Sequence, residues 1–159
     1  MDRTELFSQL MDSLFSFSQI SGVNQNIPRT YGTDDILYIA EVHLLRDIAN
    51  NTGITVTQLA QMNNKSKSAI SQMIDKLYQK NLIEKRKHPD GKRQFAIYLT
   101  DRGETVNKYH SKFDRHEYSQ VLKQLNDYSD EDFQRIITLL DVLSRGSQRA
   151  IKQKKKITV

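Results

Sequence analysis

Basic side chains are concentrated in one central segment of the chain. Residues 65–93 contain nine Lys and Arg against three acidic residues, a net charge of +6. A second basic run, from Arg149 to Lys156, has five basic residues and no acid, which leaves 10 basic against 16 acidic residues elsewhere. Lys and Arg displace counterions from phosphates, so segregated positive charge is typical of a surface that binds a polyanion. A solvated face would mix both signs, and we therefore expect nucleic acid as the partner.

Patterns typical of enzymes and metal sites are missing from the sequence. The chain has four histidines, His43, His88, His110 and His116, and no cysteine. The lack of cysteine excludes disulfides, thiolate zinc sites and cysteine nucleophiles. The sequence contains no Gly-rich phosphate loop, G-x-S-x-G elbow or H-E-x-x-H pair. We therefore predict no enzymatic activity, no cofactor and no metal site.

Length and composition favour one small helical domain with added helices. The chain has 159 residues, of which 37% are hydrophobic, with two prolines and six glycines. So few turn-forming residues make a sandwich or barrel a poor fit. No apolar run reaches the roughly 20 residues that cross a bilayer, and the N-terminus does not resemble a secretory signal. We expect a cytoplasmic protein with no membrane partner.

Both ends of the chain predict amphipathic helices. Residues 6–20 form one helix, which Ser21-Gly22 should end, and Thr33 or Asp34 should cap a second helix that ends near Asn50. Ser129 and Asp132 can cap a last helix that runs to Gly146. The two outer helices carry apolar stripes that need a partner surface: Leu6, Phe7, Leu10, Leu14, Phe17, Ile136, Leu140 and Leu143. They could pack on each other in a monomer or on a second copy in a dimer.

The middle of the chain predicts two short helices. Thr55 and Gln58 form a capping box before a helix that Asn63-Asn64 should end. Ser66 can cap the next helix, and Asn81 stands where a left-handed residue would end it. The apolar positions of this second helix share one face: Ile70, Met73, Ile74 and Leu77.

A hairpin with a basic tip follows. Residues 82–87 and 94–100 read as two strands joined around Pro89-Asp90-Gly91, and a long helix should start near Asp101. In the second strand, Phe95, Ile97 and Leu99 should alternate inward. A helix pair followed by a basic hairpin is a winged helix-turn-helix, whose second helix fits the major groove of DNA. The predicted fold class is therefore mainly α with a small β-hairpin wing.

These residues resemble the MarR (multiple antibiotic resistance regulator) family of bacterial transcription factors. The most specific part runs from Thr55 to Gly103, with Thr-Val-Thr-Gln-Leu-Ala in the first motif helix, Leu82-Ile83-Glu84-Lys85 entering the wing and Leu99-Thr100-Asp101-Arg102-Gly103 leaving it. The family wing usually reads Asp-x-Arg. Here Arg93 takes the arginine position, Gly91 takes the aspartate position, and Asp90 comes one residue early.

The resemblance implies a homodimeric DNA-binding regulator. We expect a dimerisation helix and linker at 1–32, a winged helix-turn-helix at 33–103, dimerisation helices at 104–148 and a basic tail at 149–159. Two-fold symmetry would place two recognition helices one turn of DNA apart, on a palindromic operator. By family analogy we expect a repressor that a small-molecule effector releases from DNA. The effector would bind in a crevice lined by Leu44, Ile48 and Tyr109.

The expected DNA contacts fall into two groups. Ser68, Ser71 and Gln72 should lie on the outward face of the recognition helix, where Gln can pair with adenine. Lys92 and Arg93 should reach the backbone or minor groove from the wing. The full predicted set is Lys65, Ser66, Lys67, Ser68, Ser71, Gln72, Lys76, Arg86, Lys92 and Arg93.

Two alternatives remain open at this point. One is a zinc-responsive regulator, because Glu41 and His43 could approach His110 in a family-like fold. The other is a winged-helix adaptor that binds proteins and does not read DNA. An adaptor would not need a basic face on both the recognition helix and the wing, and a zinc sensor would need a convergent set of ligands.

Overall fold

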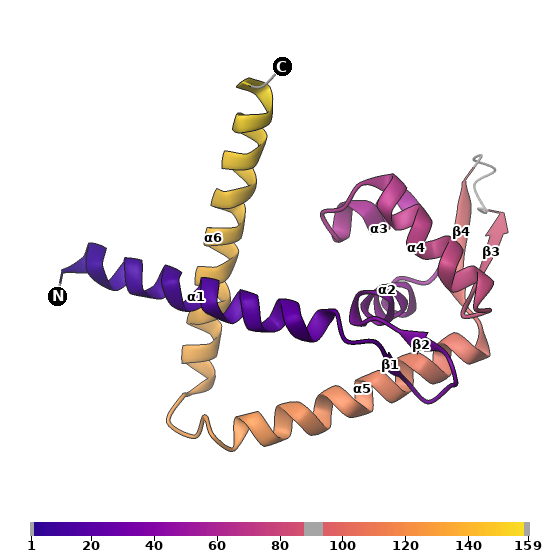
Figure 1. Cartoon of the computed structure of the whole chain (residues 1–159), viewed down its shortest axis with the longest axis horizontal. Coiled ribbons are helices and arrows are strands. Elements are labelled where there is room, and N and C mark those ends of the chain that lie inside the picture. The colour runs from indigo at the N-terminus through magenta and orange to yellow at the C-terminus, as the bar shows by residue number, and fades with distance from the viewer. Residues whose placement is uncertain (1, 88–93, 158–159) are drawn as a thin grey trace. The chain divides into compact units, whose positions relative to one another are not determined.

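Helices form most of the molecule, and the chain divides into two units (Figure 1). The computed structural model describes residues 2–87 and 94–157. The first unit is Met1–Asp114 and the second is Arg115–Val159. The elements in order are α1 (Arg3–Gln25), β1 (Arg29–Thr30), β2 (Ile36–Leu37), α2 (Ile39–Asn50), α3 (Val56–Met62), α4 (Lys67–Gln79), β3 (Ile83–Lys87), β4 (Phe95–Leu99), α5 (Asp101–Leu122) and α6 (Asp130–Ile157).

The core of the first unit is shared by α2, α3, α4 and the β3–β4 hairpin. Fully buried side chains from all of these elements meet there: Leu44, Leu45, Ile48, Leu59, Ile70, Ile74, Leu77, Ile83 and Ile97. Burying one such side chain contributes roughly 1.5–3 kcal/mol. The core therefore fixes α4 between α3 and the hairpin, which confirms the winged helix-turn-helix.

Local sequence signals set the ends of α3 and α4 as predicted. Thr55 Oγ1 accepts a hydrogen bond from the backbone N–H of Gln58 (3.3 Å), and Gln58 Oε1 accepts one from the backbone N–H of Thr55 (2.9 Å). Ser66 Oγ accepts a hydrogen bond from the backbone N–H of Ala69 (3.2 Å) and so caps α4. Asn64 and Asn81 both have positive φ, which lets the chain turn after each helix.

The hairpin is antiparallel, with Ile83 opposite Leu99 and Lys87 opposite Phe95. Ile97 is fully buried as expected, but the predicted inward position of Phe95 is wrong, because its side chain is 57% exposed. Phe95 lies at the end of the strand, beyond the core that covers Ile97. The predicted turn at Pro89-Asp90-Gly91 lies outside the described residues.

Three predicted helix limits are wrong. Helix α1 continues through Ser21-Gly22 to Gln25, and α6 continues through Gly146 into the predicted basic tail. A single glycine costs a helix only about 1 kcal/mol, and neither stretch contains proline. Helix α2 begins at Ile39 and not after Thr33 or Asp34, with Glu41 accepting a hydrogen bond from the backbone N–H of Tyr38 (2.9 Å).

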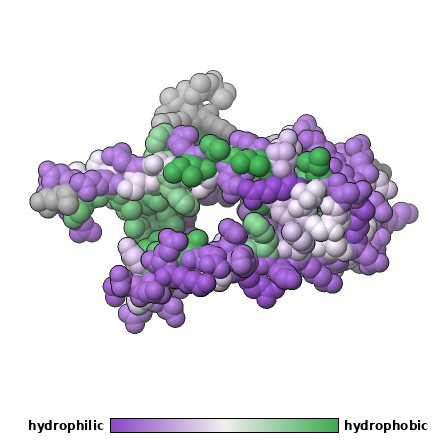
Figure 2. All heavy atoms as spheres, turned by 60° about the horizontal axis from the view of Figure 1, so that its bottom comes forward, coloured by the Kyte–Doolittle hydropathy of each residue, from purple (hydrophilic) through white to green (hydrophobic). Residues whose placement is uncertain are grey.

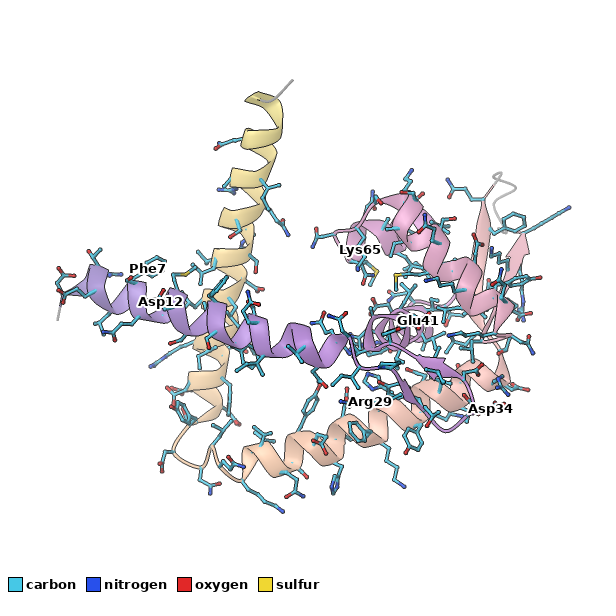
Figure 3. All side chains as sticks on the ribbon, in the orientation of Figure 1. Phe7, Asp12, Arg29, Asp34, Glu41 and Lys65 are labelled. Atoms are coloured by element: carbon cyan, nitrogen blue, oxygen red, sulfur yellow. The ribbon has the colours of Figure 1, made fainter. Side chains whose placement is uncertain are left out.

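The segment before α2 forms a short hairpin instead of a helical turn. Strands β1 and β2 pair there, and Arg102 at the start of α5 donates a hydrogen bond to Asp35 (2.8 Å) and pairs with Asp34. Figure 3 shows Asp34 beside this end of α5. The hydrogen bond from Arg102 lowers the pKa of the Asp34 carboxyl. These long-range contacts hold the loop in place.

The apolar stripes of α1 and α6 are open to solvent in the single chain. No residue of α1 is buried, and the described side chains of α6 are exposed or half-buried. The residues predicted for dimerisation are among them: Leu6, Phe7, Leu10, Leu14, Phe17, Ile136, Leu140 and Leu143. Figure 2 shows hydrophobic side chains at the surface next to hydrophilic ones. None of the described helices is long and apolar enough to span a membrane.

Gly103 allows α5 to start directly against the backbone of Leu82. A Cβ at Gly103 would lie 2.0 Å from the carbonyl oxygen of Leu82. We therefore expect Gly103→Ala to lower the free energy of unfolding by roughly 1–3 kcal/mol, because the helix must shift away from the core.

The matched control is Gly22→Ala, a helical glycine in α1 with no atom within 4 Å of the added Cβ. This change should be neutral or stabilising, because Ala has the higher helix propensity. Urea unfolding of both variants measures the difference. Equal stability of the two variants would contradict the close packing of α5 on Leu82.

Candidate nucleic-acid interface

Helix α4 presents a polar face opposite its buried face. Ile70, Ile74 and Leu77 point into the core, while the side chains on the other side are exposed. At 100° per residue, Ser68, Gln72 and Lys76 follow one another along this open face. Lys65 precedes them in the turn between α3 and α4, where Figure 3 labels it. The predicted outward face of the recognition helix is therefore confirmed for these positions.

Two predicted contact residues, Ser66 and Ser71, differ from Ser68 and Gln72 in their surroundings. Ser66 caps α4, and its Oγ also shares a hydrogen bond with Ser68 Oγ (3.0 Å). Ser71 differs from the predicted outward position, because it is half-buried and faces the hairpin. It lines a cavity of about 220 Å³ together with Thr57, Lys85 and Phe95. Ser71 therefore lies at the side of α4.

The hairpin adds positive charge next to α4. Arg86 lies over the ring of Tyr98 at 4.5 Å and forms an ion pair with Glu84. Lys85 Nζ lies 2.6 Å from Asp75 Oδ1 on α4, a contact that sequence reasoning missed because it joins residues from two elements. Lys92 and Arg93, the predicted wing-tip contacts, lie outside the described residues.

The predicted effector residues have different surroundings. Leu44 and Ile48 are each only 1% exposed and belong to the core of the first unit. Tyr109 is 49% exposed and packs against Gly32, where an added Cβ would lie 3.0 Å from its ring. The positive φ of Gly32 and this close approach explain why glycine occupies the position. Leu44 and Ile48 therefore pack in the hydrophobic core of the first unit.

A pair of histidines lies between α2 and α5. The rings of His43 and His110 are 5.2 Å apart, and the ring of Tyr31 meets His110 edge-on at 5.7 Å. His110 is 1% exposed, and within the described chain neither of its ring nitrogens makes a hydrogen bond, although Asp114 Oδ1 lies 3.4 Å from Nδ1. The expected approach of His43 to His110 is therefore confirmed.

These histidines do not form a metal centre with Glu41. The Glu41 carboxylate instead accepts a hydrogen bond from Tyr38 and lies 3.8 Å from Lys80 Nζ. Residues 2–87 and 94–157 contain no group of three His, Cys, Asp or Glu side chains that could hold a metal ion. The geometry therefore does not support the convergent ligand set that a zinc sensor needs.

Burial lowers the pKa of both histidines. For His110, burial is the main cause, the carboxylate of Asp114 opposes it, and the charge of Arg46 adds to it. For His43, burial again dominates, followed by the charges of Arg46 and His110. Both imidazoles are therefore held in the neutral form more strongly than a free histidine.

This burial predicts a fall in stability at mildly acidic pH. In the unfolded chain a histidine binds a proton below its ordinary pKa of 6.5, whereas native His110 resists protonation until a lower pH. Because the unfolded state then binds more protons, the free energy of unfolding decreases as the pH falls below 6.5. Denaturant unfolding between about pH 8 and pH 5 measures this slope, and His110→Leu should reduce it.

The control is His116→Gln, which changes an exposed histidine of the same helix. This variant should keep the slope of the wild-type protein. A His110→Leu protein with the full wild-type slope would show that burial of His110 does not cause the pH dependence.

A family model and two curated relatives match parts of the chain. The MarR family model matches residues 37–95. The chain is 30% identical over 109 residues to the HTH-type transcriptional regulator BilQ of Clostridium symbiosum (strain WAL-14163), which covers 68% of this chain and 73% of BilQ. It is 24% identical over 102 residues to the uncharacterized HTH-type transcriptional regulator YhjH of Bacillus subtilis (strain 168), where the match spans 64% of this chain but only 58% of YhjH.

Solved structures share the fold. The structure of Streptococcus pneumoniae FabT in complex with DNA matches with a TM-score of 0.65 and 19% identity, over 93% of this chain and 99% of the FabT chain. ZitR of Lactococcus lactis, a zinc-responsive MarR family member, matches with a TM-score of 0.65 and 21% identity, over 89% and 98% of the two chains. With the fold, the family model and the match to BilQ in agreement, the chain belongs to the MarR family of transcriptional regulators.

Proposed function

We propose that this MarR-family regulator binds a palindromic DNA operator as a homodimer and represses transcription until an effector releases it. The observation that supports DNA binding most directly is the position of α4. Its apolar face is packed in the core, and its polar face is open beside the basic hairpin. An α-helix fits the major groove of B-DNA, and a hairpin at its side can then reach the flanking backbone.

Base reading belongs to the exposed polar side chains near the start of α4. Ser68 and Gln72 are one helical turn apart and both exposed. A Gln side chain can donate and accept hydrogen bonds with adenine at the same time. We assign Ser66 and Ser71 to supporting contacts, because Ser66 caps the helix and Ser71 lies at its side.

The lysines and arginines supply affinity for phosphate. Lys65, Lys67, Lys76 and Arg86 are all exposed on or beside α4. Arg86 pairs with Glu84, but its side chain is 60% exposed and its guanidinium can still reach a phosphate. Contacts of this kind position a protein on the duplex without reading sequence, and each neutralised phosphate makes binding more sensitive to salt. From sequence alone, we extend this role to Lys92 and Arg93 at the wing tip.

The dimer accounts for the open apolar stripes of α1 and α6. Helices of this kind are stabilised mainly by burying an apolar face, and both faces are left uncovered by the single chain. A second copy of the chain would cover them. We therefore keep residues 1–32 and 104–148 as the proposed dimerisation regions.

Repression and release follow from that arrangement. A dimer with two-fold symmetry would place its two α4 helices on two half-sites, so the operator is expected to be palindromic. A protein bound there can block the polymerase. An effector that binds better to one spacing of the two α4 helices would shift the dimer toward that spacing and change its affinity for DNA.

The two alternatives are less well supported. A protein-binding adaptor would not need exposed basic residues on both α4 and β3. A zinc sensor is disfavoured by the described residues, which offer His43 and His110 near each other but no group of three ligands. DNA binding is therefore the function that the geometry supports best.

Replacing Gln72 tests base reading. Duplexes selected from a random pool define the preferred site, and Gln72→Ala should cost roughly 1–3 kcal/mol of binding free energy on that site while relaxing preference at one base pair per half-site. Lys76→Ala, one turn further along the same face, should instead weaken selected and scrambled duplexes equally and reduce the salt slope by about one. A Gln72→Ala protein that loses affinity equally for both duplexes would contradict this role of Gln72.

Replacing Leu140 tests the dimer. Leu140 lies on the apolar stripe of α6 with Ile136 and Leu143, while Thr138 lies on the opposite side of the helix. An Asp at position 140 would place a charge in the interface, so Leu140→Asp should shift the mass measured by sedimentation toward the 18.5 kDa of one chain. Thr138→Asp should remain dimeric. A wild-type mass of 18.5 kDa at micromolar concentration would rule out the dimer.

A further inference from the structure

One side of α4 lies next to the hairpin, with Ser71 half-buried and Asp75 and Tyr78 exposed. Ser71, Asp75 and Tyr78 are spaced by four and three residues, so they share one side of the helix. Ser71 lines the cavity that also includes Lys85 of β3. Figure 1 shows α4 and the hairpin side by side. This side of the recognition helix is therefore directed at the wing.

Lys85 is held from this side by two residues of α4. Its Nζ donates a hydrogen bond to Asp75 Oδ1 at 2.6 Å and lies 5.1 Å from the centroid of the Tyr78 ring. The Lys85 side chain is only 28% exposed. A carboxylate and an aromatic face both attract an ammonium group, so the charge of Lys85 is already engaged within the protein.

The contact is made where the hairpin leaves the core. Along β3, Ile83 is buried, Glu84 and Lys85 are half-buried, and Arg86 and Lys87 are exposed. Beyond Lys85, the strand is no longer covered by the core. The ion pair therefore joins α4 to β3 at the point where the described strand leaves the core.

The same contact explains an acid on a helix that faces DNA. Asp75 is the only acidic residue in the sequence of α4, and it is 57% exposed. An unpaired carboxylate there would repel DNA phosphates. Lys85 neutralises that charge, and Asp75 in turn makes the Lys85 ammonium less available to DNA.

We propose that Lys85 is a positioning residue, which Asp75 and Tyr78 hold so that the wing is set in register with the base-reading face of α4. Lys85 would then affect how strongly the protein prefers its selected DNA sequence. Unlike Lys65, Lys67 and Lys76, it would not neutralise DNA phosphates. This inference rests on the proposed DNA-binding function, and it goes beyond it by dividing the basic residues of the wing into two classes.

The test combines charge removal with charge exchange. Lys85→Met and Asp75→Asn each break the ion pair while keeping the size of the side chain, and the double variant closes a mutant cycle. Each single variant should reduce the ratio of selected to scrambled duplex affinity by roughly two- to fivefold, as expected for a partly exposed ion pair. The double variant should lose no more than either single variant. The salt slope should stay unchanged in the double variant, which has neither an unpaired Asp75 carboxylate nor a freed Lys85 ammonium, because no phosphate contact is lost.

Two further proteins sharpen the result. Exchanging the charges, with Asp75→Lys and Lys85→Asp together, should restore only part of the affinity ratio, because the ion pair is re-formed but the contact of an ammonium at position 85 with the Tyr78 ring is lost. Lys87→Met removes a positive charge two residues along the same strand, on the same side of β3, and should leave the affinity ratio unchanged.

A phosphate-binding role for Lys85 gives the opposite pattern. The double variant, which removes both charges, would then lower the salt slope by about one and weaken all duplexes equally. That result overturns the positioning role. A mutant cycle on urea unfolding, measured without DNA, keeps this outcome separate from failure of DNA binding itself. If no duplex binds the wild-type protein, the proposed function fails, but the unfolding cycle still measures the coupling between Asp75 and Lys85. Effects of the two substitutions on the free energy of unfolding that simply add would show that the ion pair does not contribute.

Discussion

The burial of one face of α4 is the constraint on which the rest of the interface depends. Ile70, Ile74 and Leu77 lock this helix against α3 and the hairpin, and no rotation of the helix can expose another face without opening the core. The orientation of Gln72 and Lys76 toward solvent follows directly from that packing. The polar residues that we propose for DNA binding are thus presented by a rigid core and not by a flexible loop.

A second set of contacts joins this core to its neighbours. Arg102 connects the start of α5 to the loop before α2, and Gly103 brings α5 against the backbone of Leu82. About two turns further along α5, His110 packs against His43 of α2. Helix α5 is therefore attached to the winged core at several points over its first three turns. A change in the core that moves α2 would therefore also move α5, and this helix is a suitable path for the coupling that we propose between an effector and DNA binding.

The sequence predicted local features better than long-range ones. The caps at Thr55 and Ser66 and the turn at Asn81 depend on neighbouring residues only, and all were confirmed. The start of α2 was wrong because Asp34 pairs with Arg102, a partner 68 residues away. The contact of Lys85 with Asp75 was missed for the same reason, since a count of charges along the chain does not reveal which charges neutralise each other.

Hydroxyl-radical and guanine-methylation footprinting on a selected duplex would test the central claim most directly, because it locates the protein on DNA without assuming any contact. We predict two protected major-groove segments whose centres are about one helical turn, or 10–10.5 base pairs, apart, or a multiple of this spacing, related by two-fold symmetry and each flanked by protection of the backbone from the wing. A single protected segment, or protection spread evenly along the duplex at physiological salt, would contradict a dimer that reads a palindrome through α4.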